Sequence, residues 1–157
     1  METKQAFEQI LEELEQAMSR VSSMHESPWD FGTGTPLYRT EIHTVQAIGE
    51  HPGINVTELA DLMGVTKGAV SQTVGKLAGK GLVRKTHADD NAKEILLNLT
   101  ERGQTGFRNH QKMHMAMLDT VREFYGDRLE EKLQAFASVM RDLNAILAMY
   151  EERIQKG

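Results

Sequence analysis

The heptapeptide RNHQKMH, residues 108–114, carries two histidines four positions apart. On a helix this spacing puts His110 and His114 on one face, where both imidazoles can reach one metal ion. The zinc-peptidase pattern H-E-x-x-H has the same spacing, and its glutamate activates the metal-bound water as general base. Gln111 occupies that position, and a neutral amide cannot accept the proton. The chain also has no nucleophile–base pair and no phosphate-binding glycine loop, so we expect no enzyme.

A third histidine extends the possible metal site. His43 lies on a short predicted helix, opposite its apolar residues, and the apolar residues around the histidine pair predict that His110 and His114 point inward. Without cysteines, zinc takes about four nitrogen or oxygen ligands. We therefore predict a possible zinc site of His43, His110, His114 and a fourth ligand, Glu26 first, with His25 or Glu41 as alternatives. The other interpretation is that these histidines are hydrogen-bonded inner residues beside a pocket for an organic effector.

Charge is distributed unevenly along the chain. The 157 residues carry a net charge of −5, yet residues 66–93 hold six cations and two acids, a net of +4. A local basic segment in an acidic protein indicates a local anionic partner, although a solvated lysine-rich surface would look the same. The first residues are acidic and amphipathic, and no apolar run approaches the ~20 residues of a membrane span. We expect a cytoplasmic protein without a membrane partner.

Two short helices that could position the basic residues follow each other closely. Asn55 and Glu58 form a capping pair for a helix over 55–63, which Gly64 ends. Thr66 caps a second helix over 66–80, in which Val70, Val74 and Leu77 form the expected buried side. A helix, a short turn and a second helix form a helix-turn-helix unit.

The flanking segments are mostly helical as well. Apolar periodicity predicts helices over 3–24, about 40–51, 100–125 and 128–154, and two extended runs, 82–88 and 94–100, predict a β-hairpin. The fold class is therefore mainly α with a small β-hairpin wing. In the loop 25–36, Trp29 and Phe31 either anchor the loop in the core, which we prefer, or form a wall of an effector pocket.

The helix over 66–80 has an unusual exposed side. Gly68, Gly75 and Gly79 fall within ~40° of one another at ~100° per residue, on the side that also carries Ser71 and Gln72. Each glycine costs ~1 kcal/mol relative to alanine in a helix. A small, polar face suits a helix that another object approaches closely, and the B-DNA major groove admits one helix. The alternative is a merely solvent-exposed face.

A family resemblance rests on the same residues. The segment ELADLMGVTKGAVSQTVGKLAGKGLVRK, followed by a polar hairpin tip and LLNLTERG, resembles the MarR family of winged-helix transcriptional regulators. The specific part covers residues 54–106. The resemblance implies one MarR-like domain over 1–157, with dimerisation helices in 1–36 and 107–157 and a DNA-binding lobe in 37–106. It also implies a homodimeric repressor that binds a pseudo-palindromic operator in double-stranded DNA, controlled by an effector bound between the lobe and the dimerisation helices.

The resemblance also assigns the DNA contacts. The helix 66–80 would enter the major groove, and the hairpin 84–94 would be the wing along the minor groove. The predicted DNA-binding residues are Thr66, Lys67, Gly68, Ala69, Ser71, Gln72, Gly75, Lys76, Arg84, Lys85 and Lys93. The family's wing tip usually has Asp-Arg-Arg where this chain has Asn91, Ala92 and Lys93, so we expect weaker dependence on the wing. A zinc-sensing branch uses a histidine on the second helix and a pair on the fifth, which His43, His110 and His114 resemble.

Overall fold

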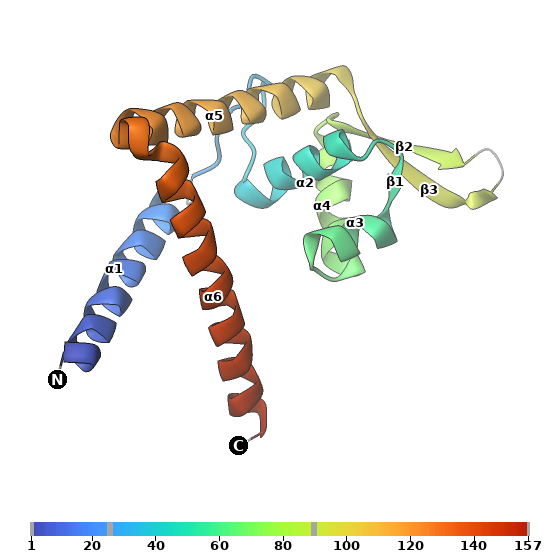
Figure 1. Cartoon of the computed structure of the whole chain (residues 1–157). Helices are drawn as coiled ribbons and strands as arrows, with labels where there is room; N and C mark the ends of the chain where they lie inside the picture. Colours follow the sequence, from blue (N-terminus) through green and yellow to red (C-terminus); the bar gives the residue numbers. More distant parts are fainter. Residues whose placement is uncertain (1, 25–26, 89–90, 157) are drawn as a thin grey trace. The chain divides into compact units, whose positions relative to one another are not determined.

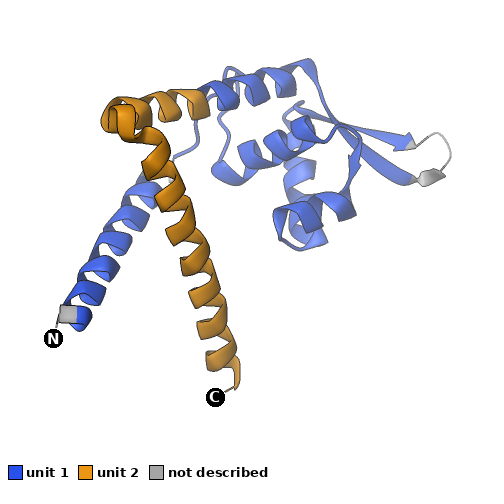
Figure 2. Ribbon diagram, in the orientation of Figure 1, with its two compact units in different colours: residues 1–112 blue, residues 113–157 orange. Residues whose placement is uncertain are grey.

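The computed structural model describes residues 2–24, 27–88 and 91–156 and divides the chain into two compact units, residues 1–112 and 113–157 (Figure 2). The first unit holds α1 (Glu2–Met24), α2 (Arg39–Glu50), β1 (Ile54–Asn55), α3 (Val56–Met63), α4 (Lys67–Gly79), β2 (Val83–Ala88), β3 (Asn91–Leu99) and the first part of α5 (Glu101–Tyr125) (Figure 1). The second unit holds the rest of α5, the 3-10 turn η1 (Gly126–Arg128) and α6 (Leu129–Lys156). The predicted fold class, mainly α with a small hairpin, is confirmed. The predicted division at 36/37 and 106/107 stays a prediction.

The helix-turn-helix forms through the predicted local signals. The Asn55 side chain accepts a hydrogen bond from the Glu58 amide at 2.9 Å, and the Glu58 carboxylate accepts one from the Asn55 amide at 3.1 Å. Gly64 adopts φ 65° after the last turn of α3, a backbone conformation that glycine favours. The Thr66 hydroxyl accepts from the Ala69 amide at 3.2 Å and starts α4. These contacts define both ends of the turn between α3 and α4.

The sheet has one strand more than the sequence predicts. Its order is β1-β3-β2, and both pairings are antiparallel. The predicted hairpin is confirmed in β2 and β3, but β3 begins at Asn91, three residues before the predicted start. The predicted tip residues Asp89 and Asp90 lie outside the described residues. The additional strand β1 contains only Ile54 and Asn55, which is too short to show a period-2 pattern.

The apolar core of the first unit lies between α2, α3, α4 and the sheet. Val70, Val74 and Leu77 bury one side of α4, as predicted, with exposures of 2% or less. They belong to one cluster with residues such as Val45 of α2 and Leu97 of β3. Burying such side chains contributes about 1.5–3 kcal/mol each. This burial stabilises a helix that contains three glycines, and it leaves the opposite side of α4 exposed.

The first turn of α5 packs tightly on the turn between α4 and β2. The Thr100 amide donates to the Leu82 carbonyl at 3.0 Å, and the Thr100 hydroxyl donates to the Gly81 carbonyl at 2.7 Å. A Cβ on Gly103 would overlap the Leu82 carbonyl oxygen and would lie 3.2 Å from the Leu99 Cβ. Only glycine therefore permits this approach, which connects α4, the wing and α5 at one point.

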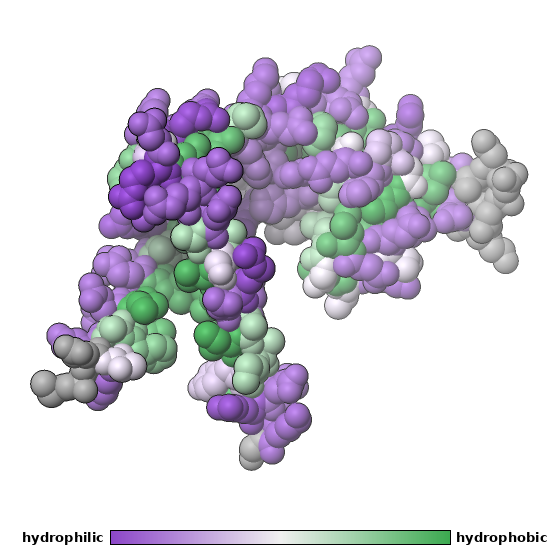
Figure 3. Space-filling view, in the orientation of Figure 1, coloured by the Kyte–Doolittle hydropathy of each residue, from purple (hydrophilic) through white to green (hydrophobic). Residues whose placement is uncertain are grey.

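Helix α6, in the second unit, has no buried residue in the single chain. Large apolar side chains remain exposed along it, and Figure 3 shows apolar surface on this helix. Examples are Phe136 at 63%, Val139 at 58% and Ile146 at 60% exposure. In the first unit, α1 exposes Phe7 at 59% and Ile10 at 63%. Within the described ranges, no helix combines the length and apolarity needed to cross a membrane.

We predict that Gly103→Ala destabilises the protein by about 1–3 kcal/mol, the usual cost of forcing an extra group into a packed site. The added methyl group would overlap the Leu82 backbone, which cannot move without shifting the start of β2. Urea denaturation followed by circular dichroism measures the change. Gly75→Ala is the matched control, because nothing lies within 4 Å of a Cβ there, and it should stabilise α4 by up to ~1 kcal/mol. Equal stabilities for Gly103→Ala and the wild type would contradict the prediction.

Candidate nucleic-acid interface

The side of α4 that faces away from the core presents the predicted contact residues. All eight predicted residues of the second motif helix are exposed: Thr66, Lys67, Gly68, Ala69, Ser71, Gln72, Gly75 and Lys76. Thr66 is the N-cap of α4, and its hydroxyl accepts the hydrogen bond of the Ala69 amide. The exposed Lys67 follows it directly. A surface with one cationic end and short polar side chains can bind phosphate oxygens and base edges. Exposure agrees with the predicted roles, which remain predictions.

The glycines of this surface are not required by packing within the chain. A Cβ on Gly75 or Gly79 would meet nothing within 4 Å, and one on Gly68 would meet only the Thr66 hydroxyl at 3.9 Å. None of the three has a positive φ. Alanine would therefore fit at each position and favour the helix. Packing within the described residues therefore does not require these glycines, whereas a partner that approached the helix backbone closely would.

The wing contributes cations on both of its faces. Arg84 and Lys85 are exposed on β2, opposite Asn98 and Leu97 of β3. Consecutive strand residues point to opposite faces, so these two cations cannot both face one partner surface. The backbone of Lys93 belongs to β3, but its side chain lies outside the described residues. The predicted contact of Lys93 therefore stays untested.

Lys80, in the same basic segment, has protein partners. Its Nζ lies 2.8 Å from Glu41 Oε2 of α2 and donates to the Pro36 carbonyl at 3.1 Å. The Glu41 side chain is only 6% exposed. As the alternative fourth zinc ligand, Glu41 would have to exchange this ion pair with Lys80 for the metal, and that use stays a prediction.

A loop segment, residues 29–37, forms a closed strap against α4 and α5. Its ends pair through two backbone hydrogen bonds between Trp29 and Leu37, at 3.0 and 2.9 Å. Arg102 of α5 donates twice to the Thr33 carbonyl, at 3.1 and 2.6 Å, and Asn109 donates to the Phe31 carbonyl at 2.8 Å. Arg102 and Asn109 were not among the predicted site residues. An arginine in the first turn of a helix gives no signal of partners 69 residues away.

The two aromatic residues of the strap behave differently. Phe31 is half-buried, packs against the core cluster and meets the His110 ring edge-on, with ring centroids 5.6 Å apart. It anchors the loop, as the preferred interpretation predicts. Trp29 is 48% exposed, so that interpretation is wrong for Trp29 in the single chain. The backbone bridge to Leu37, and not indole burial, holds this end of the strap.

Two of the three predicted histidine ligands lie close together. His110 is 1% exposed, and its ring centroid lies 5.4 Å from that of the half-buried His43. His114 follows one turn later on α5, in the second unit, and is exposed in the single chain. Its predicted part in a metal site stays a prediction. His25 and Glu26 lie outside the described residues. Among the residues that are described, no three His, Asp or Glu side chains form a group that could hold a metal.

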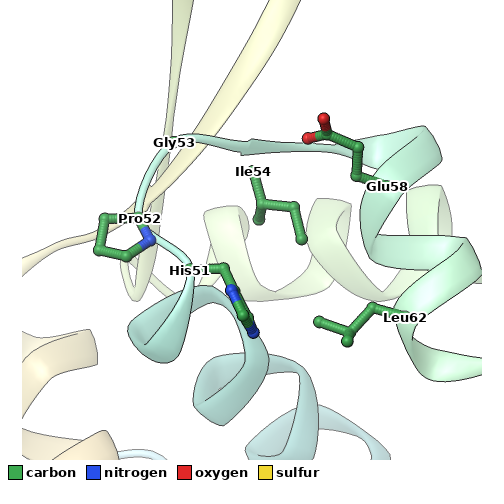
Figure 4. A pocket seen from close by; sticks show the side chains of 6 residues that line it. All are labelled: His51, Pro52, Gly53, Ile54, Glu58 and Leu62. Carbon is green, nitrogen blue, oxygen red and sulfur yellow. The ribbon is translucent and has the colours of Figure 1, made fainter.

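Two adjoining pockets lie along α2 and α3 in the first unit. The larger, about 470 Å³, is lined by His51, Pro52, Gly53, Ile54, Glu58 and Leu62 (Figure 4). Figure 4 shows Leu62 pointing from α3 toward the end of α2, where His51 lies. The second pocket, about 310 Å³, is also lined by His51 and Leu62 and extends to His43. The sequence predicted neither pocket, because each depends on how α2 meets α3.

Solved structures share this fold. FabT of Streptococcus pneumoniae, in complex with DNA, matches with a TM-score of 0.73 and 21% identity, over 90% of this chain and 96% of FabT. The zinc-responsive MarR family member ZitR of Lactococcus lactis matches with a TM-score of 0.67 and 22% identity, over 86% of this chain and 96% of ZitR. At these identities the likeness concerns the fold alone.

Sequence comparisons establish the family. The family model described as the MarR family matches residues 37–95, from the end of the strap into the wing. The uncharacterized HTH-type transcriptional regulator YhjH of Bacillus subtilis (strain 168) is 31% identical over 128 residues, which cover 82% of this chain and 73% of YhjH. The exposed α4, its capped helix-turn-helix and the antiparallel wing agree with both matches. This chain therefore belongs to the MarR family of winged helix-turn-helix transcriptional regulators.

Proposed function

We propose that this protein is a sequence-specific, dimeric DNA-binding repressor whose helix α4 enters the major groove. The observation that carries the proposal is the exposed side of α4, where glycines without a packing role surround Ser71 and Gln72. A major groove about 12 Å wide admits a helix, and its base edges offer donors and acceptors to short polar side chains. We assign Gln72 to a base edge, and Lys67 and Lys76 to phosphates.

Family membership and the fold of FabT, which was solved with DNA, support the same partner. Within the basic segment, Lys67, Lys76, Arg84 and Lys85 are exposed. Lysines and arginines that meet phosphates release condensed counterions, which drives binding and makes it depend on salt. We infer that α4 carries more of the affinity than the wing, because the wing tip lacks the family's arginines.

The exposed apolar residues of α1 and α6 support a second copy of the chain as a further partner. Apolar surface of this extent is uncommon on a monomer and marks an interaction site. A two-fold dimer would present two copies of α4 to half-sites about one helical turn apart. Such a dimer would cover a promoter, so repression is the sense of control that we propose, with an effector that adjusts the affinity.

We predict that binding of a promoter fragment weakens steeply as salt increases. Lys67→Ala should weaken binding to all sequences alike and reduce the slope of log K against log salt by about 0.9, the effect of one lost phosphate contact. Gln72→Ala should cost about 1–3 kcal/mol on the specific fragment only. Fluorescence anisotropy with specific and scrambled fragments measures both. Affinity that is insensitive to salt would rule out the proposed function.

We also predict that Gly75→Ala separates stability from function. The methyl group fits the free chain and should stabilise α4 by up to ~1 kcal/mol. The same methyl group should weaken DNA binding, since it stands where the groove must approach the backbone. Urea denaturation and anisotropy on one preparation test both effects. Unchanged affinity would mean that the glycine face does not touch DNA.

A second candidate function is metal-responsive regulation, with zinc bound by His43, His110 and His114. The observation that favours it is the 5.4 Å between the His43 and His110 ring centroids, together with the likeness in fold to zinc-responsive ZitR. His110 and His114 are one helical turn apart on α5. The fourth ligand, Glu26 in our prediction, would come from the loop before α2. The metal would supply a fixed link between these elements.

Zinc dialysis followed by metal analysis tests this candidate. We expect about one zinc per chain in the wild type and little in His43→Ala or His110→Ala. His87→Ala is the control, because His87 is exposed on the wing strand β2. If zinc is the effector, the operator affinity of the wild type should change by about 1–3 kcal/mol on adding the metal. A wild type that retains no zinc would end the metal hypothesis and leave the DNA-binding proposal intact.

A further inference from the structure

Lys80 differs from the other cations of the basic segment. Its side chain is 25% exposed and lies 2.8 Å from Glu41, whose side chain is 6% exposed, whereas Lys67 and Lys76 are exposed on α4. Its ammonium also donates to the Pro36 carbonyl at the end of the strap, at 3.1 Å. Two of the three ammonium protons are therefore engaged within the protein. A lysine whose ammonium group is held in this way is poorly placed to bind a DNA phosphate.

Glu41 connects this ion pair to the start of α2. The same Oε2 that meets Lys80 also accepts a hydrogen bond from the Tyr38 amide at 3.0 Å. Tyr38 is the N-cap residue of α2. A buried carboxylate is costly without a cation, so loss of Lys80 would disturb the first turn of α2 as well. The pair joins the C-terminus of α4 to the N-terminus of α2.

The backbone of Lys80 is held from a third element. Arg102 of α5 donates to the Lys80 carbonyl at 3.1 Å, while its other nitrogens donate to Thr33 and Thr35 of the strap. Lys80 is the C-cap residue of α4, and its amide bonds back to the Lys76 carbonyl at 2.9 Å. The end of α4 is therefore fixed by α2, α5 and the strap together.

From these contacts we infer that Lys80 is a positioning residue for DNA recognition: with Glu41 it fixes the C-terminal end of α4 and makes no phosphate contact. The inference rests on the proposed DNA binding. Recognition groups need to be held within about 0.5 Å and 10–20° of their productive geometry. Val70, Val74 and Leu77 hold the inner side of α4 in the core. The contacts of the Lys80 side chain and carbonyl add the fixed point at the C-terminal end that limits tilting of the helix. Loss of the pair lets the helix tilt and lowers affinity without removing a charge from the interface.

Salt dependence separates this role from a phosphate contact. A lysine that neutralises one phosphate contributes about 0.9 to the slope of log K against log salt. A positioning lysine contributes nothing to that slope. Lys76 lies on the same helix and is exposed, so Lys76→Met provides the matched control for a phosphate contact. Glu41→Gln keeps the shape of the side chain and removes the charge that binds Lys80.

The experiment measures operator binding over a salt series for the wild type, Lys80→Met, Glu41→Gln, the double variant and Lys76→Met. We expect Lys80→Met and Glu41→Gln each to lower the affinity for the operator about tenfold. The double variant should lose no more affinity than the more affected single variant, because the two residues are in direct contact and act as a unit. Their salt slopes should equal that of the wild type, while Lys76→Met should lose about 0.9. Circular dichroism of each variant checks that it is folded.

Hydrogen exchange of the free protein gives a second measurement that needs no DNA. The Lys80, Gly81 and Leu82 amides bond to carbonyls of α4 at 2.9 Å each. In Lys80→Met and Glu41→Gln these amides should exchange faster than in the wild type, and in Lys76→Met they should not. A wild type that binds no promoter fragment would contradict the proposed function, and this exchange experiment would still report on the positioning role.

Three outcomes would overturn the inference. In the first, the slope of log K against log salt falls in Lys80→Met as it does in Lys76→Met, while Glu41→Gln binds like the wild type. That result would make Lys80 a phosphate contact. In the second, the losses of the two single variants add in the double variant, so that the pair does not act as a unit. In the third, exchange at Lys80, Gly81 and Leu82 is unchanged in both variants.

Discussion

The arrangement of the DNA-binding unit depends on the approach of α5 to the Leu82 carbonyl. Gly103 has no Cβ, so the first turn of α5 can lie directly on the turn between α4 and β2. Thr100 adds hydrogen bonds to the Gly81 and Leu82 carbonyls at the same place. The end of α4, the start of the wing and the start of α5 therefore share one backbone contact. Interiors packed this closely deform little, so a shift of one of these elements must move the others.

The two sides of α4 serve different requirements. Its inner side buries Val70, Val74 and Leu77 in the core, which stabilises the helix against the low helix propensity of its glycines. Its outer side carries Gly75 and Gly79 in open space, where alanine would fit and would favour the helix. Stability alone would select alanine there. The glycines make sense for a helix backbone that a groove must approach.

The strap, residues 29–37, relates the histidines to this helix. Near its start, Phe31 meets the ring of His110, which in turn lies near His43. Near its end, the Pro36 carbonyl accepts from Lys80 at the C-terminus of α4. One short segment of the first unit thus contacts both His110 and the C-terminal end of α4.

The sequence by itself determined the features that depend on neighbouring residues: the caps at Asn55 and Thr66, the turn at Gly64, the buried side of α4 and the hairpin. These follow from helical periodicity and from hydrogen bonds over three residues, which are visible in a short window. Only the tertiary structure decided the partners of Lys80, which lie 39 and 44 residues away, the two-residue strand β1 and the exposure of Trp29 and His114. Charge and spacing show that a lysine or a histidine is present. Which group it meets depends on the packing of distant segments, and no local pattern encodes that.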